Sequence, residues 1–423
     1  MSKPPRTFDV VVAGAGPGGI AAAVIAAECG RTVALIDEAP FAGGQIWRNT
    51  GSIPQSPQAV EWLIRLQKQS SIVRLQQSQA TANPAPDELL INGPAGVERL
   101  RWQSLILATG ARERFLPFPG WTLPGVMGAG ALQPLVKSGW SVKGKRIVIA
   151  GTGPLLLAVA ELLMKQRADV LCVLEQASSK QLNRFGLSLV CRPEKLLEGI
   201  VLRAKLGKRY SADSYVLSVQ HGNERLQVKM NRKGREEIVE CDLLGCGFNL
   251  IPNNELAQIL RCELNASGFV AVDSERRTSV AGIYAVGELT GIGGAEKAIV
   301  EGQVAALSSC GKTIEAMNLA RSLIGEDRFV AKLRETFRLR PELSRLAAPE
   351  TILCRCEDVT RGEIEFAKSS REAKLQSRCG MGRCQGRVCG PILQELFGME
   401  SPRVRAPIVP TSIASLAAAD GSE

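Results

Sequence analysis

An apolar stretch, a glycine-rich turn and a second apolar stretch recur along the chain at 8–38 and 145–175, with a variant at 282–307. In each copy the first stretch is rich in β-branched residues, as buried strands are. The second stretch has the length and pattern of a helix. Strands that alternate with helices predict parallel sheets. We therefore expect an α/β fold.

The pattern changes after the third copy. Charges and leucines at helical spacing predict a helical connector, and five cysteines then lie close together in the sequence. We expect the following parts: a discontinuous dinucleotide-binding domain of residues 1–140 and 251–312, a second, degenerate dinucleotide-binding-like domain of 141–250, the connector of 313–349, a cysteine-bearing domain of 350–398 and an extended tail of 399–423.

Composition excludes several classes of protein. Among 423 residues, 45% are hydrophobic and 22% charged, which excludes wholesale disorder. The net charge of +10 would suit a nucleic acid. However, the basic residues are scattered and no nucleic-acid motif accompanies them, so we expect no such partner. Glycines interrupt the first apolar run and no secretory signal is seen, so we expect no transmembrane segment and a cytoplasmic location.

The first glycine turn has the features of a dinucleotide site. Gly14, Gly16 and Gly19 allow, in order, a tight turn, close approach of backbone to a pyrophosphate and close packing of helix on strand. The helix N-terminus that follows attracts phosphate. The next strand ends on Asp37 and Glu38, and an acid at that point binds a ribose.

The second turn is altered. Gly151 and Gly153 remain and Glu175 still ends the next strand, but Leu156 replaces the third glycine. A leucine there pushes the helix away from the strand. We therefore favour a retained fold with a dead or altered site, with a working second dinucleotide site as the alternative.

Four cysteines, Cys354, Cys356, Cys384 and Cys389, have a spacing that suits a tetrahedral zinc ion or a 2Fe-2S cluster. Cys379 complicates this choice, because it stands as far before Cys384 as Cys389 stands after it. Cys389 is slightly favoured, since it precedes a predicted helix and a helix N-terminus lowers the pKa of a thiol. Zinc sites more often use C-x-x-C pairs.

No catalytic base stands out, and the catalytic residues stay unassigned. The single histidine, His221, lies in a predicted surface turn. Cys241 and Cys246 are expected to be core thiols. Three arginines near the predicted flavin are candidates for clamping a substrate carboxylate: Arg48, Arg112 and Arg114. No acid–base residue accompanies them in the sequence.

Three segments resemble those of two-dinucleotide-domain flavoproteins. They are the Ala-Thr-Gly turn at 108–110, Tyr-Ala-Val-Gly-Glu at 284–288, where the family has Asp for the final Glu, and Gly-Gly-Gln-Ile-Trp at 43–47. The resemblance implies a Rossmann-like fold of the glutathione-reductase type that binds FAD. The residues assigned to FAD are Gly14, Gly16, Gly19, Asp37, Glu38, Gly44, Gln45, Thr109, Gly110, Gly287 and Glu288.

Residues 354–359 and 378–386 resemble the small bacterioferritin-associated-ferredoxin-like (BFD-like) domain. This resemblance implies a 2Fe-2S cluster whose ligands are Cys354, Cys356, Cys384 and Cys389. Position 379 is not a required ligand in that domain. Arginines next to these ligands would raise the reduction potential of the cluster.

The order of these parts, with the segments GGQIW, LPGVMGAGAL and GMGRCQGR, resembles the FAD and iron–sulfur subunit of multi-subunit amine dehydrogenases. That family includes subunits of D-hydroxyproline dehydrogenase, opine oxidases for octopine or nopaline, and hydrogen cyanide synthase. The resemblance implies an electron-transfer role in an enzyme that acts on CH–NH donors. A partner flavoprotein subunit would oxidise the amine, and a small ferredoxin-like 2Fe-2S subunit is a further candidate partner. The alternatives are an NAD(P)H-dependent reductase and a scaffold with vestigial cofactor sites.

Overall fold

The chain forms two compact units, each assembled from separate stretches of sequence. The computed structural model describes residues 4–48, 56–190, 192–401 and 403–419. Unit 1 comprises Met1–Arg112, Ile251–Val330 and Arg403–Glu423, and unit 2 comprises Glu113–Leu250 and Ala331–Pro402. The chain passes between the units in strands β7 (Ala111–Glu113) and β16 (Leu250–Pro252) and in helix α10 (Leu323–Thr336).

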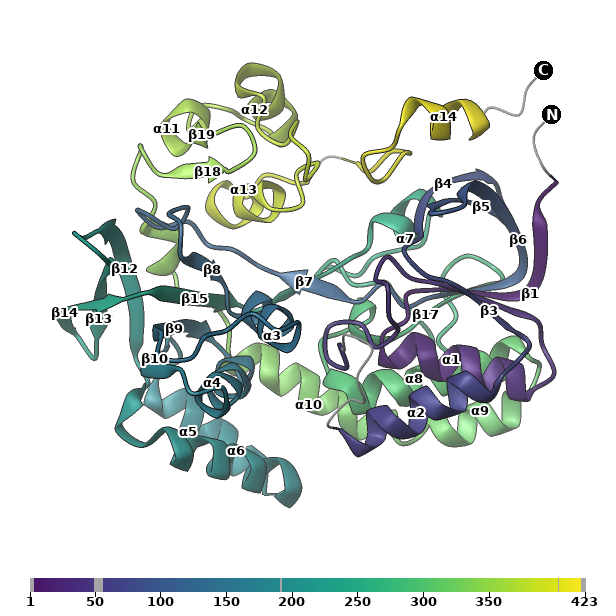
Figure 1. The fold of residues 1–423 in the computed structure, drawn as a ribbon, viewed down its shortest axis with the longest axis horizontal. Coiled ribbons are helices and arrows are strands. Elements are labelled where there is room, and N and C mark those ends of the chain that lie inside the picture. The colour runs from purple at the N-terminus through teal and green to yellow at the C-terminus, as the bar shows by residue number, and fades with distance from the viewer. Residues whose placement is uncertain (1–3, 49–55, 191, 402, 420–423) are drawn as a thin grey trace. The chain divides into compact units, whose positions relative to one another are not determined.

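Unit 1 is built on a seven-stranded sheet (Figure 1). Its central strand, β1 (Arg6–Ala13), pairs in parallel with β2 (Val33–Ile36) on one side and β6 (Gly96–Leu107) on the other. The second half of β1 and all of β2 are apolar because both faces of the sheet are covered there. The other strands are β3 (Ile72–Leu75), β4 (Gln79–Ala85), β5 (Glu88–Gly93) and β17 (Ile283–Ala285).

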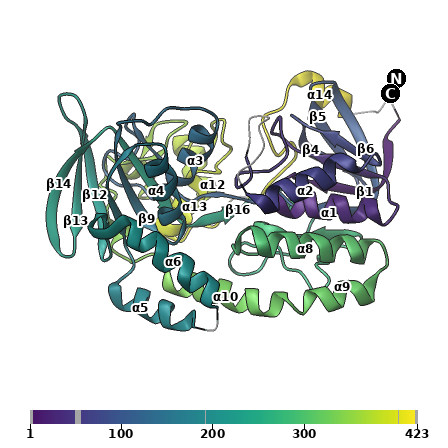
Figure 2. The ribbon, with the colours of Figure 1, turned by 60° about the horizontal axis from the view of Figure 1, so that its bottom comes forward.

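Helices of unit 1 gather on one face of this sheet: α1 (Pro17–Glu28), α2 (Pro57–Lys68), α8 (Gly294–Ser309) and α9 (Thr313–Ala320) (Figure 1). Figure 2 shows α8 alongside α1. Two glycines allow this close packing. An ideal Cβ at Gly302 would lie 2.1 Å from the carbonyl oxygen of Gly18, and one at Gly18 would lie 2.9 Å from that of Ala298. The shorter helices are α7 (Glu255–Ile259), η2 (Gly287–Leu289) and α14 (Ile413–Ala419).

Unit 2 contains a second parallel sheet, in the order β11-β10-β9-β15-β8. Its strands are β8 (Val126–Gly128), β9 (Arg146–Thr152), β10 (Asp169–Glu175), β11 (Tyr210–Ser211) and β15 (Leu243–Phe248). Beside it are helices α3 (Ala129–Lys137), α4 (Leu155–Lys165), α5 (Ser179–Ser188) and α6 (Pro193–Leu206), with η1 (Gly207–Arg209). A three-stranded antiparallel sheet follows, made of β12 (Ser214–His221), β13 (Leu226–Arg232) and β14 (Arg235–Cys241). The predicted α/β fold is confirmed.

The cysteine-bearing region belongs to unit 2 and has little regular structure. It contains β18 (Ile352–Cys354), β19 (Val359–Thr360), α11 (Arg361–Ile364), α12 (Ser370–Ser377) and α13 (Cys389–Phe397), preceded by η3 (Leu343–Arg345). One hydrophobic core joins this region to the second α/β fold. Phe118 and Val148 pack in the same cluster as Leu353 and Ile392. The indole Nε1 of Trp121 also donates to the carbonyl oxygen of Ile352 at 2.6 Å.

Two details differ from the sequence-based expectations. The tail was expected to be extended, but it forms α14, where alanines favour a helix and the Ser412 hydroxyl accepts the amide of Ser415 at 3.1 Å. His221 ends β12 rather than lying in the turn, although it is exposed as expected. Among the described residues, no helix is long and apolar enough to cross a membrane.

Candidate functional site

The first glycine turn, between β1 and α1 of unit 1, has a backbone that only glycines allow. Gly14 has a φ of +110°, and an ideal Cβ there would lie 2.2 Å from the carbonyl oxygen of Ala108. A Cβ at Gly19 would lie 1.8 Å from the carbonyl oxygen of Gly14. Both contacts are with backbone that cannot move aside. The two glycines therefore perform the turning and packing roles that the spacing predicts.

The middle glycine leaves open space above the turn. Apart from Gly16 and its two chain neighbours, no described residue has an atom within 4 Å of an ideal Cβ at Gly16, which is the N-cap of α1. The loop that contains Gly44 supports the turn from another side, because the amide of Gly43 donates to the carbonyl oxygen of Ala15 at 2.8 Å. An open glycine at a helix N-terminus is the arrangement that receives a pyrophosphate. The residues present therefore fit a dinucleotide such as FAD.

The acid that faces this turn is Asp37, which follows β2. Its carboxylate accepts hydrogen bonds from the amides of Ala15 at 2.5 Å and Ala39 at 2.7 Å. Burial raises the pKa of Asp37 above its ordinary value. Glu38, in contrast, is exposed and accepts a bond from Gln79 Nε2 at 3.0 Å. Of the two predicted acids, the structure therefore brings only Asp37 to the turn. Gln45, also predicted, is exposed.

Thr109 and Gly110 lie where β6 ends, and both are tied to the segment before α7. The Thr109 hydroxyl donates to the carbonyl oxygen of Asn253 at 2.6 Å, and the amide of Asn253 donates to the carbonyl oxygen of Gly110 at 2.9 Å. Gly110 has a φ of +68°. The Thr109 hydroxyl is thus used within the protein, and the contribution of these residues is the shape of their backbone.

The three arginines considered as substrate clamps all have protein partners. Arg48 Nη1 donates to Gln45 Oε1 at 3.2 Å, and Arg112 Nη1 pairs with Glu255 at 2.9 Å. In unit 2, Arg114 Nη1 pairs with Glu395 at 3.0 Å. A clamp for a substrate carboxylate needs the whole guanidinium fork. None of the three presents an unengaged fork.

The predicted Gly287–Glu288 turn starts η2, and the carboxyl group of Glu288 is available to a ligand there. Glu288 is half-buried and makes no hydrogen bond or ion pair with any described residue. Burial raises its pKa to about 7, although the nearby Lys297 acts in the opposite direction. A carboxyl group in this position can bind a hydroxyl group of a ligand.

Sequence reasoning missed a buried network directly beneath this turn. Glu301 of α8 is fully buried and accepts the amide of Gly287 at 2.6 Å. Its carboxylate also binds Lys297 Nζ at 2.5 Å and Arg276 Nη1 at 2.8 Å. These charges hold one another and fix the turn that carries Glu288. The available signal was a Lys–Glu pair at i,i+4 spacing in a mostly apolar helix.

The second turn, in unit 2, repeats the wiring of the first. The φ of Gly151 is +145°, and its ideal Cβ would lie 1.9 Å from the carbonyl oxygen of Gly247. Glu175 accepts the amides of Gly153 at 2.7 Å and Ala177 at 2.8 Å. Burial raises the pKa of Glu175 to about 7. The side chain of Leu156 is fully buried in the core beneath the turn.

Five thiols of unit 2 gather at the start of α13. The sulfur atoms of Cys354, Cys379 and Cys389 lie within 4.8 Å of one another and are buried. Cys384 is within hydrogen-bonding distance of both Cys389 and Cys356, and Cys356 is exposed. Hydrogen bonds from Cys379 and Cys389 lower the pKa of Cys354, and bonding to Cys389 lowers that of Cys384. Hydrogen bonds to Cys354 and Cys379 raise the pKa of Cys389, so the expectation that its helix N-terminus lowers that pKa was wrong. A group of thiols that can lose their protons on binding suits a zinc ion or an iron–sulfur cluster.

Cys379 lies nearer to this group than the sequence suggested. Prediction set it aside, yet it belongs to the tightest triad, whereas the four predicted ligands do not form one group of that size. The reason is local backbone. Arg378 is in the left-handed region with a φ of +66°, and Gly380 follows with a φ of +81°. These two residues end α12 and fold Cys379 inwards.

The order of the two folds and turns matches a known family. The family described as "Pyridine nucleotide-disulphide oxidoreductase" matches residues 8–302, which contain both glycine turns. The chain belongs to this family. This pyridine nucleotide-disulphide oxidoreductase is accordingly an FAD-dependent oxidoreductase, as the sequence predicted.

Curated relatives match almost the whole of this chain. An opine oxidase subunit from Agrobacterium tumefaciens (strain Ach5) is 32% identical over 97% of this chain and 91% of its own. "Hydrogen cyanide synthase subunit HcnB" of Pseudomonas protegens is 31% identical over 90% of each chain. The crystal structure of L-proline dehydrogenase from P. horikoshii matches with a TM-score of 0.67 and 18% identity, over 98% of this chain and 81% of that one. The first two confirm the predicted resemblance, and the third shows the fold.

Proposed function

We propose that this chain is the FAD- and 2Fe-2S-containing electron-transfer subunit of a hetero-oligomeric dehydrogenase or oxidase of amines. The substrate class would be a D-amino acid such as hydroxyproline, an opine, or glycine. The observation that carries the proposal is the gathering of five thiols in unit 2 of an FAD-dependent oxidoreductase. FAD exchanges electrons in pairs and a 2Fe-2S cluster exchanges them singly, so one chain with both can divide an electron pair.

Unit 1 supplies the residues that would hold FAD. The backbone of Gly14, Gly16 and Gly19 and the N-terminus of α1 would receive the pyrophosphate, because Gly16 is open on that side. Asp37 would bind the adenosine ribose while it also fixes the amide of Ala15. Glu288, half-buried and without a protein partner among the described residues, would bind a hydroxyl of the ribityl chain. We keep the other predicted residues as further candidates for contact with FAD: Glu38, Gly44, Gln45, Thr109, Gly110 and Gly287.

Unit 2 supplies the ligands of the cluster. We assign Cys354, Cys356, Cys384 and Cys389, following the BFD-like pattern, with Cys379 as an additional thiol beside them. The exposed Cys356 would place one edge of the cluster near solvent, where a redox partner can approach. Zinc remains the competing occupant of this donor set, and metal analysis separates the two.

The amine itself would be oxidised on a partner flavoprotein subunit. Both curated relatives are named as subunits, of an opine oxidase and of a hydrogen cyanide synthase. The arginines near the first turn support this division of labour, because Arg48 and Arg112 are engaged with Gln45 and Glu255. A small ferredoxin-like 2Fe-2S subunit is the second partner that we propose.

The test compares the chain alone with the chain co-purified with a flavoprotein from the same organism that is similar to the amine-oxidising subunits of such enzymes. Each preparation is assayed with a panel of D-amino acids, opines and glycine and a dye acceptor. We expect the isolated chain to contain flavin and iron but to turn over none of the amines, and the complex to reduce the dye. Steady turnover by the isolated chain at the rate of the complex would disprove the proposed division of labour.

A further inference from the structure

A short segment of unit 2 lies across the second glycine turn. The segment is residues 337–340, which follow α10 and are named here the strap. Phe337 is 6% exposed, and its ring carbon Cγ lies 4.0 Å from an ideal Cβ at Gly153. The ring also packs edge-on against Phe185, with centroids 5.5 Å apart. In unit 1, no described residue occupies the same position above Gly16.

The strap lies at the ends of three neighbouring strands, and its backbone is bonded to residues that follow two of them. Gln176, which follows β10, donates through Nε2 to the carbonyl oxygen of Arg338 at 3.1 Å. Gln176 Oε1 accepts the amide of Arg340, also at 3.1 Å. Asn249, which follows β15, donates to the carbonyl oxygen of Phe337 at 3.1 Å. Gly153 itself follows β9. Ligands of open parallel sheets bind at these carboxyl ends, so the strap occupies the ligand position.

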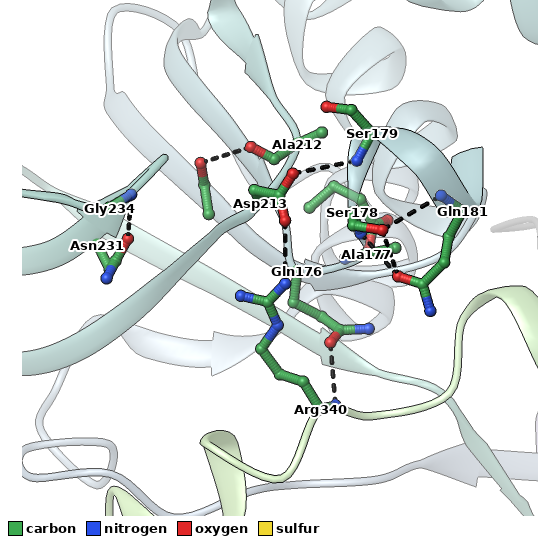
Figure 3. Close-up of polar contacts among 12 residues, drawn as sticks. Gln176, Ala177, Ser178, Ser179, Gln181, Ala212, Asp213, Asn231, Gly234 and Arg340 are labelled. Atoms are coloured by element: carbon green, nitrogen blue, oxygen red, sulfur yellow. Dashed lines mark hydrogen bonds and ion pairs between the residues drawn. The ribbon is translucent and has the colours of Figure 1, made fainter. Parts of the chain in front are cut away.

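The strap is also anchored at its far end. Arg340 Nη2 pairs with Asp213 Oδ1 at 3.1 Å, and the guanidinium lies over the Tyr215 ring, 5.2 Å from its centroid. Figure 3 shows Gln176 reaching the backbone of Arg340 while Asp213 binds both that side chain and Ser179. A hollow of about 440 Å³ remains beside Arg340, but neither Gly151 nor Gly153 lines it.

We propose that the strap is an internal occupant of the second glycine turn and excludes nicotinamide dinucleotides from unit 2. Its residues then determine donor specificity, because NADH and NADPH cannot deliver hydride through this turn. Leu156 does not supply this exclusion. Its side chain is directed into the core beneath the turn, and the space above the turn is taken by Phe337. The proposal depends on neither the cluster nor the amine substrate.

The first test is a gain of binding. The full chain is saturated with FAD, so that the first turn is occupied, and titrated with NADH and NADPH by calorimetry up to millimolar concentration. We expect no saturable binding by the wild-type chain. The double variant Phe337→Ala/Arg340→Ala should gain saturable binding at least about tenfold tighter than the wild-type limit, because loosening the strap raises the fraction of open turns.

The matched control is Arg338→Ala. Arg338 lies in the strap and carries the same charge as Arg340, but its side chain is exposed and makes no hydrogen bond or ion pair within the described part of the chain. This variant should behave like the wild type. Saturable binding of NADH by the wild-type chain would overturn the proposal. So would a folded double variant that gains no binding, or equal gains in the double variant and Arg338→Ala.

Hydrogen exchange tests the strap in the unaltered protein. The amide of Arg340, bonded to Gln176, should exchange at least about tenfold more slowly than an unprotected amide. Gln176→Ala should remove that protection, while the amide of Ala177, bonded to Glu175, should remain slow. Fast exchange at Arg340 in the wild-type chain would mean that the strap is not seated, and the proposal would fail.

Discussion

The two glycine turns of this chain share their wiring and differ in what lies above them. In each, the acid at the end of the second strand accepts two hydrogen bonds. One comes from a backbone amide of the turn, and the other from the amide two residues after the acid itself. These are Ala15 and Ala39 for Asp37, and Gly153 and Ala177 for Glu175. Above Gly16 the described part of the chain leaves open space, whereas Phe337 covers Gly153. A glycine fingerprint therefore reports how the backbone turns, and a distant segment decides whether the turn is accessible.

The difference also concerns where each unit can hold a redox group. Unit 1 offers its turn, together with the carboxyl group of Glu288, which is close in sequence to the buried Lys297–Glu301 pair. Unit 2 has a covered turn, and its capacity for a redox group lies in its thiols. Four experiments test whether the two units differ in this way.

The largest expected effect is the loss of flavin from a Gly16→Val variant. Gly16 has a φ of −74°, which any residue adopts, and its ideal Cβ meets no atom, so the variant should fold. The new side chain would occupy the place of the pyrophosphate, and flavin absorbance should disappear. Gly186→Val is the control and should retain full flavin, because Gly186 lies within α5 of unit 2 and its ideal Cβ likewise meets no atom of the described residues. A yellow Gly16→Val protein would remove the assignment of the first turn.

The second experiment concerns the thiols. Cys384→Ser should lose iron and the visible absorbance of the cluster, because serine is a poor replacement for a thiolate ligand. Cys379→Ser should keep both, even though Cys379 lies within the buried triad. Iron analysis and absorbance spectra measure the outcome. If Cys379→Ser loses its iron and Cys384→Ser retains it, Cys379 must replace Cys384 in the proposed set of ligands.

The third experiment concerns the buried charges of unit 1. Glu301→Ala leaves Lys297 and Arg276 buried without their carboxylate and should cost about 3–5 kcal/mol of unfolding free energy. Glu315→Ala removes the exposed partner of Lys312 and should cost at most about 1 kcal/mol. Urea unfolding gives both values. Equal losses of unfolding free energy in the two variants would show that the buried network does not stabilise the turn that carries Glu288.

The smallest effect is a pH dependence in unit 2. Burial raises the pKa of Glu175 to about 7, above its ordinary value of 4.5. The folded state then binds the proton more tightly than the unfolded state, so the free energy of unfolding should fall as pH rises from about 4.5 to about 7. The fall should be on the order of 3 kcal/mol, at about 1.4 kcal/mol for each pH unit between the two values. Urea unfolding at several pH values should show this slope flattened in Glu175→Gln, whatever the overall stability of that variant.

Much of this architecture could be predicted because local sequence determines it. Gly14 and Gly19 are required by backbone contacts inside the turn, and the apolar strands on either side have only one way to be buried. Asp37 follows from the same logic, since it stands at the end of the next strand. The α/β fold and the family were therefore accessible from residue patterns.

The remaining features depend on contacts between distant residues. The strap was expected to be part of a helical connector, but Phe337 is placed by Gly153 and Phe185, which no local pattern reveals. Glu301 and Lys297 were hidden because a buried charge pair resembles an ordinary helix position in sequence. The place of Cys379 in the buried triad was also hidden, because the residue that takes the left-handed conformation just before it, Arg378, is not a glycine.

The packing of α1 on α8 has a consequence for synthesis on the ribosome. α1 is apolar on all sides and completes its burial only when Gly302 lies against Gly18, yet the whole stretch Glu113–Leu250 is translated between the two helices. At about 5–20 residues per second, the nascent N-terminal sheet waits roughly 15–60 s for its cover. Unit 2 waits for its own last segment, because its core extends to Met399. The two units are thus interleaved in time as well as in sequence, and we expect nascent chains to need a chaperone that shields α1 until translation has passed residue 309.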